Sequence, residues 1–236
     1  MEPSFAAGTL IHTTTGLVPI ESVRVGDAVM SKRDPDGLTG YQRVLRTFSE
    51  QNRAVCKLSA FHNNQQETLI VCADHQFYIS GYDTETVDPD YLDYYANRTG
   101  WRRADLIDQG ALLQLKDGSS ALYHEIKRIW RTATQGLGWM QMSLESFPTG
   151  YHIDLQGGQV VELAGTVPTD FASDESFRDR LDDEDMAEHW SYKSTVYGIE
   201  VEDFHTYFVG EIGIWVRDSV SSEPGRDWAC RFDESD

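Results

Sequence analysis

Four places in the 236-residue sequence carry side chains that could attack, protonate or orient a peptide bond. Ser4 lies near the start, Cys72 and His75 lie in the stretch VCADHQFYI, and His205 and Asp218 lie in the closing part of the chain. A serine hydroxyl is a nucleophile once a base activates it, and a histidine can move a proton near neutral pH. Each residue alone has an ordinary structural explanation, so their order along the chain carries the interpretation.

Composition and charge limit the kind of protein that this can be. Hydrophobic residues make up 40% of the chain and aromatic residues 11%, enough for the core of one large domain or two small ones. The formal net charge of -19 argues against a nucleic-acid partner. No apolar run approaches the roughly 18 residues of a membrane-spanning helix, and no signal peptide is recognisable. We therefore expect a soluble monomer without a membrane partner, and the sequence assigns it to no compartment.

The recurring short runs of β-branched and aromatic residues predict a mainly β fold. Such runs include ETLIVCADHQFYIS, YHEIKRIWR and TYFVGEIGIWV, and turn residues separate them. Two of these turns, at residues 117–118 (Asp-Gly) and 157–158 (Gly-Gly), predict hairpins and hence mainly antiparallel pairing. Three cysteines without framework spacing give no disulfide scaffold.

Two segments interrupt this β pattern and are interpreted as insertions. Residues 81–100 interleave aspartate and tyrosine. Residues 169–190 carry nine acidic side chains against Arg178 and Arg180. The second segment is either a short acidic helix or a solvated insertion, and the charge run favours the solvated insertion.

A weak internal repeat predicts two similar halves. The segments ESVRVGDAVMS (21–31) and ADLIDQGALLQL (104–115) each place an apolar pair before a glycine and an apolar run after it. After a turn, RVLRTF (43–48) follows the first and EIKRIW (125–130) follows the second. Chance similarity between short β segments is the alternative explanation.

In four ordered blocks the chain resembles the Hint domains, the self-processing module shared by inteins, hedgehog proteins and bacterial polymorphic toxins. The blocks are SFAAGTLIHTTTGLVPIESVRVGDAV (4–29), LIVCADHQFYI (69–79), GWRRADLIDQGALL (100–113) and VYGIEVEDFHTYFVGEIGIWVRDS (196–219). The resemblance implies a flat, horseshoe-like β fold of two pseudo-symmetric halves, with both ends of the domain meeting at its centre. It also implies a remnant of an upstream segment at residues 1–3, an autoprocessing domain at 4–218, and a linker or the start of an effector at 219–236.

In this family the side chain of the first residue attacks the carbonyl before it and converts that peptide bond to an ester or thioester. The resemblance therefore implies attack by Ser4 on the bond that joins Pro3 to Ser4. His75 matches the histidine that protonates the leaving amide nitrogen. Asp203 and His205 belong to the closing block, and both can reach the site if they share one face of a strand. The substrate is the chain's own flanking segments, within a larger secreted or toxin polypeptide, and no cofactor or metal is implied.

Several residues depart from the family pattern. Ser4 stands where toxin-type relatives carry cysteine, either naturally or as an engineered replacement that blocks cleavage. Cys72 replaces a threonine, and its thiol is a weaker hydrogen-bond donor. Arg217 and Asp218 stand where the family has histidine and asparagine, so we expect weak C-terminal cleavage and no splicing.

Two other interpretations remain open at this stage. The first is a catalytically inactive Hint scaffold that serves as an adaptor or spacer. The second is a metal site formed by Cys72, His75 and His205, because a Cys-x-x-His spacing suits zinc. Residues 72 and 75 point to opposite faces of an extended strand, which argues against the metal site unless a turn intervenes.

Overall fold

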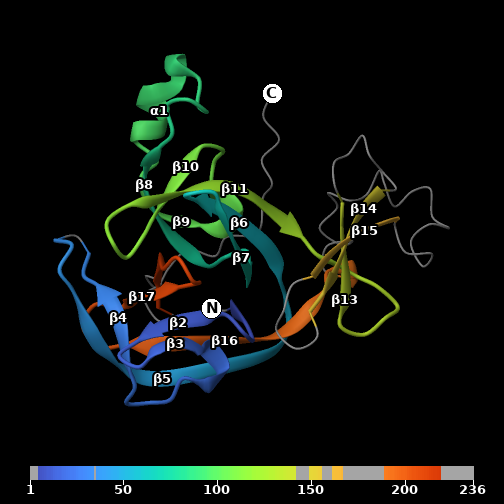
Figure 1. Ribbon diagram of the computed structural model, residues 1–236, viewed down its shortest axis with the longest axis horizontal. Coiled ribbons are helices and arrows are strands. Elements are labelled where there is room, and N and C mark those ends of the chain that lie inside the picture. The colour runs from blue at the N-terminus through green and yellow to red at the C-terminus, as the bar shows by residue number, and fades with distance from the viewer. Residues whose placement is uncertain (1–4, 35, 142–148, 156–160, 167–188, 219–236) are drawn as a thin grey trace.

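The computed structural model describes residues 5–34, 36–141, 149–155, 161–166 and 189–218, and strands dominate them (Figure 1). The first strands are β1 (Phe5–Ala6), β2 (Leu10–Thr13), β3 (Gly16–Pro19), β4 (Ala28–Lys32), β5 (Thr39–Ala54), β6 (Cys56–His62), β7 (Gln65–Val71), β8 (Gln76–Tyr82) and β9 (Gly100–Arg103). The later strands are β10 (Ala111–Gln114), β11 (Ser120–Arg128), β12 (Trp130–Arg131), β13 (Leu137–Gln141), β14 (Thr149–Asp154), β15 (Val161–Thr166), β16 (Lys193–Val201), β17 (Thr206–Val209) and β18 (Ile214–Arg217).

Helical structure in the described residues is short. It comprises η1 (Ile20–Ser22), η2 (Pro89–Tyr91), α1 (Leu92–Ala96) and η3 (Ala104–Leu106). None of these helices is long and apolar enough to cross a membrane. The prediction of a mainly β fold is confirmed.

One antiparallel sheet of fourteen strands holds most of the described chain. Its order is β10-β11-β6-β7-β1-β16-β5-β4-β2-β17-β18-β8-β9, with β3 paired to β2. Because β10 also pairs with β8, the path of strands returns on itself. In Figure 1, β2 to β5 and β16 form the lower part, and β6 to β11 form the upper part. The short strand β1 joins the two parts by pairing with β7 on one side and β16 on the other.

The internal repeat corresponds to a repeated piece of structure. In the first half η1 is followed by Gly26 and then by β4, which pairs with β5. In the second half η3 is followed by Gly110 and then by β10, which pairs with β11. Both glycines have positive φ, +95° and +78°, a conformation that glycine adopts at little cost. At Gly110 a Cβ would also lie 2.7 Å from a methyl carbon of Val87, so the second turn leaves no room for a side chain.

A second, four-stranded sheet runs β12-β13-β14-β15 and lies at the right of Figure 1. Its buried residues Met140 and Ile153 form a separate hydrophobic cluster with Ile129, Val196 of β16 and Cys72. Burial of such side chains is worth about 1.5–3 kcal/mol each, which fixes this sheet against the start of β16.

The predicted hairpins and insertions can be compared with these elements. The Asp117-Gly118 turn joins β10 to β11, and these strands pair antiparallel as predicted. Strands β14 and β15 also pair antiparallel, whereas the turn at 157–158 lies outside the described residues. The insertion at 81–100 contains η2 and α1 between β8 and β9. The predicted insertion at 169–190 lies outside the described residues except for 189 and 190.

Candidate active site at the sheet centre

His75 occupies the turn between two strands of the large sheet. It follows β7 and precedes β8, and its backbone N–H donates to the carbonyl of Cys72 over 3.1 Å. Its own carbonyl accepts from the N–H of Ala104 over 2.8 Å, so both sides of the residue are held. A turn therefore separates Cys72 from His75, and the two residues do not belong to one extended strand.

The imidazole of His75 lies in an aromatic, fully buried environment. The centroid of its ring is 4.3 Å from that of Phe5 and 5.5 Å from that of Phe77, with edge-to-face geometry in both contacts. Neither ring nitrogen has a hydrogen-bond partner among the described residues. Burial lowers the pKa of the imidazole to about 3, so the ring is neutral at neutral pH. A neutral imidazole can accept a proton before it donates one.

The contact between His75 and Phe5 brings the start of the chain to this turn. Phe5 is fully buried and pairs with Val71 of β7 and Tyr197 of β16. Ser4, the predicted nucleophile, lies outside the described residues and is joined covalently to Phe5.

The end of the described chain approaches the same region. Strand β18 pairs antiparallel with β8, with Val216 opposite Phe77. Because residue numbers run in opposite directions in such a pair, this register leads Asp218 toward the level of His75. The two segments are more than 140 positions apart in sequence, and the sheet carries both to its centre.

Asp218 is buried, and hydrogen bonds fix its position. Its Oδ2 accepts from the backbone N–H of Val201 and from Nδ1 of His205, each over 3.0 Å. Its own N–H donates to the carbonyl of His205 over 2.9 Å. Since an ionised carboxylate only accepts, the proton of this hydrogen bond is on Nδ1 of His205. The carboxylate is thus both shielded from solvent and held by donors.

Asp203 and His205 lie in a turn and not on a strand face. Both have positive φ, +57° and +53°, in the turn between β16 and β17. Both residues are exposed, and the ring of His205 is directed to Asp218. We expected both side chains to reach the site from one face of a strand, and the turn does not provide such a face. Of the two, His205 is the one with a hydrogen bond to another predicted site residue.

Cys72 is buried on the side of the second hydrophobic cluster. It packs with Val55, Ile70 and Val196, whereas Phe5 and Phe77 belong to the first cluster. Among the described residues no group of three histidine, cysteine or acidic side chains could hold a metal ion. The structure thus does not bring Cys72, His75 and His205 together as metal ligands.

Arg217 and Tyr207 complete the surroundings of Asp218. The guanidinium of Arg217 lies 4.9 Å from the ring centroid of Trp101. Tyr207, which sequence reasoning did not single out, is opposite Val216, is fully buried, and has a hydroxyl without a partner in the described part of the chain. Burial and the nearby Asp218 carboxylate raise the pKa of this hydroxyl. The sequence feature that could have identified Tyr207 is its position two residues after His205 in the closing block.

Similarity to known proteins agrees with the fold described above. Residues 10–92 match the model of the pretoxin HINT domain. This segment of the chain is therefore similar to a Hint domain. The solution structure of a bacterial intein-like domain from Clostridium thermocellum is similar at 20% identity and a TM-score of 0.52, over 92% of this chain and 99% of that one. A DnaB intein from Synechocystis is similar at 14% identity and a TM-score of 0.49, over 92% and 99%. The curated proteins give no match. The Hint fold expected from the sequence is confirmed.

The buried His75 makes folding stability depend on pH. Its pKa is about 3 in the folded chain against 6.5 for an ordinary histidine, so below pH 6.5 the unfolded chain binds a proton that the folded chain does not. The associated stability is complete above pH 6.5 and is lost as pH falls toward 3. We expect the wild type to lose about 1.4 kcal/mol more per pH unit in this window than His75→Gln. Urea unfolding at pH 7, 6 and 5 measures the two slopes.

The exposed His124 provides the matched control. His124→Gln should keep the wild-type slope. Identical slopes for wild type and His75→Gln would show that His75 is protonated normally in the folded chain.

Proposed function

We propose that residues 4–218 form a self-cleaving Hint domain, which rearranges the peptide bond between Pro3 and Ser4 and releases the segment upstream of it. One observation carries the proposal. A fully buried imidazole, that of His75, lies against the residue that follows Ser4, and both of its nitrogens lack partners among the described residues. Buried polar groups without partners are rare in folded proteins. In this proposal the reacting peptide supplies those partners.

The reaction begins with attack by Oγ of Ser4 on the carbonyl carbon of Pro3. A carbon–oxygen bond forms, and the bond between that carbon and the amide nitrogen of Ser4 breaks. The nitrogen must gain a proton to leave. Because burial keeps the His75 ring neutral, the ring takes this proton from the hydroxyl and then delivers it to the nitrogen. The product is an ester, with a free amine on Ser4 and His75 again neutral.

Release of the upstream segment requires a second nucleophile. Water can hydrolyse the ester, and an added thiol can attack it. A serine hydroxyl is a weak nucleophile without a base, whereas a cysteine thiol ionises near pH 8.5 and reacts readily. A cysteine at position 4 should therefore react faster in the same surroundings.

The C-terminal junction has different chemistry. An asparagine can attack its own carbonyl with its amide nitrogen, but the carboxylate of Asp218 would have to form an anhydride. Two donors, the Val201 N–H and His205, also stabilise this carboxylate in its ionised form. Arg217 cannot relay a proton because its guanidinium remains charged. We infer that cleavage after residue 218 is weak and that splicing does not occur.

The match to a pretoxin domain supports a place within a larger toxin polypeptide. In that setting the upstream segment is the released cargo, and residues 219–236 lead to an effector. The partners of the domain are then its own flanking segments.

A reporter released from the N-terminal side tests the proposal. A folded reporter is fused upstream of Pro3 in the full chain, and release is followed on gels with and without dithiothreitol. We expect slow release with Ser4 and faster, thiol-dependent release with Ser4→Cys. His75→Ala in the Ser4→Cys background should slow release by at least about 100-fold, since general acid–base catalysis contributes about 10² to 10⁴. His124→Ala should release at the parent rate.

No release from any version, with folding confirmed by circular dichroism, would favour the inactive scaffold that serves as an adaptor or spacer. Equal release with and without the His75 side chain would remove the role given to that residue.

A reporter fused after residue 236 tests the second junction. The parent chain should retain this reporter. Asp218→Asn combined with Arg217→His should release it at a rate at least about tenfold above the parent, because an attacking amide and a proton carrier are then present. Asp203→Asn, at an exposed position, is the matched control and should release nothing. Release by the parent chain at the rate of the double variant would contradict the account of Asp218.

A further inference from the structure

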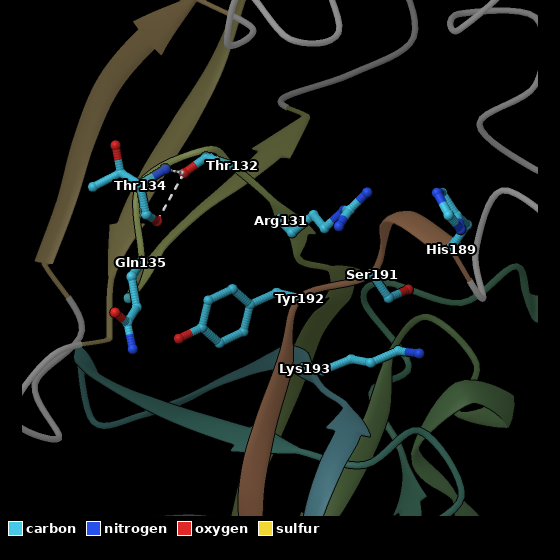
Figure 2. Close-up of a pocket in the computed structure, with 9 residues that line it drawn as sticks. Arg131, Thr132, Thr134, Gln135, His189, Ser191, Tyr192 and Lys193 are labelled. Carbon is cyan, nitrogen blue, oxygen red and sulfur yellow. Dashed lines mark hydrogen bonds between the residues drawn. The ribbon is translucent and has the colours of Figure 1, made fainter.

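A cavity of about 640 Å³ lies where the four-stranded sheet meets the start of β16. Its walls come from the end of β12, the turn before β13, and residues 189–193 (Figure 2). The volume is in the range of ordinary ligand sites. The cavity is outside the segment matched by the Hint family model and contains none of the residues assigned to cleavage.

Two cationic side chains and one imidazole line the cavity. Arg131, His189 and Lys193 line it, and none of the three makes an ion pair within the described residues. By contrast, Arg98 pairs with Asp108 and Arg103 with Asp105. No carboxylate is among the described residues that line the cavity. Two cations in one cavity without a lining carboxylate among the described residues favour an anionic ligand.

The framework around these cations is already ordered. The guanidinium of Arg131 lies 4.5 Å from the ring centroid of Trp190, which restricts its position. Ser191 pairs with Trp130 as an isolated bridge, and the N–H of Tyr192 donates to the carbonyl of Ile129 over 2.7 Å. A ligand would therefore bind without first ordering the backbone, which lowers the entropic cost of binding.

The side chains are also directed to a common space. In Figure 2, Arg131, Ser191 and Lys193 extend toward the side on which His189 lies, and Tyr192 extends to the opposite side. Arginine can bind a carboxylate through two parallel hydrogen bonds, and lysine binds it as a point charge. Uncharged groups, including Thr134, complete the lining and can bind peptide carbonyls or N–H groups.

We propose that this cavity binds a short acidic peptide segment of a partner protein. Arg131, His189 and Lys193 hold the carboxylates, and the hydroxyl of Ser191 donates to one of them. The volume exceeds what a single small oxyanion fills, which favours a segment carrying several carboxylates. The strongly negative chain repels a large acidic surface, so the occupant is a segment and not an acidic domain.

The residues that pair at the start of the described chain do not line the cavity. Strand β1 pairs antiparallel with β16, with Phe5 opposite Tyr197 and Ala6 opposite Val196. Lys193, which lines the cavity, is the first residue of β16 and lies outside this pairing. The proposal is therefore independent of the cleavage reaction.

Fluorescence anisotropy with the full chain tests the site. The probes are labelled hexaglutamate and, as the uncharged control, labelled hexaglutamine, at fixed ionic strength. We expect saturable binding of hexaglutamate only. Arg131→Gln with Lys193→Gln should weaken it at least about tenfold. Arg131→Lys with Lys193→Arg preserves both charges and should stay within about threefold of the wild type.

The matched control removes two positive charges elsewhere, at the exposed residues Arg24 and Arg43. Arg24→Gln with Arg43→Gln should bind hexaglutamate as the wild type does, and circular dichroism confirms that each variant is folded. The proposed site would be contradicted if both charge-removing double variants weakened hexaglutamate binding equally. It would also be contradicted if hexaglutamate and hexaglutamine bound equally well. Displacement of the peptide by inorganic phosphate at concentrations below that of the peptide would assign the cavity to a phosphorylated ligand and overturn the peptide proposal.

Discussion

The packing of the His75 imidazole against Phe5 and Phe77 is the contact on which the rest of the site depends. It removes the ring from water and keeps it neutral, which gives it the capacity to accept a proton. It also links the turn after β7 to the residue that follows the proposed scissile bond. A histidine in the same sequence position but exposed to solvent would not contact Phe5 in this way.

The strand order produces this contact from distant segments. Strand β1 is only two residues long, yet it lies between β7 and β16 and so holds Phe5 on both sides. Strand β18 pairs with β8 and directs Asp218 toward the same region. The N–H of Val201, at the end of β16, then holds the Asp218 carboxylate. The long strand β16 thus contributes to the surroundings of both Phe5 and Asp218.

Local sequence patterns predicted the fold class, the turn between β10 and β11, and a repeat of an apolar pair, a glycine and an apolar run. These features depend on short-range alternation and on residues such as Gly110. The site was predicted only in part. Neither the turn that holds Asp203 and His205 at positive φ nor the burial of Tyr207 can be read from alternation, because both depend on strands that pair across the molecule.

The protonation state of His75 in the folded chain tests this account most directly. Nitrogen-15 NMR of the histidine rings in the full chain, with His75→Gln to assign the signal, reports it as pH is lowered. The account predicts a neutral ring for His75 down to pH 5, because its pKa is about 3. A ring that titrates near pH 6.5, as an exposed histidine does, would contradict it.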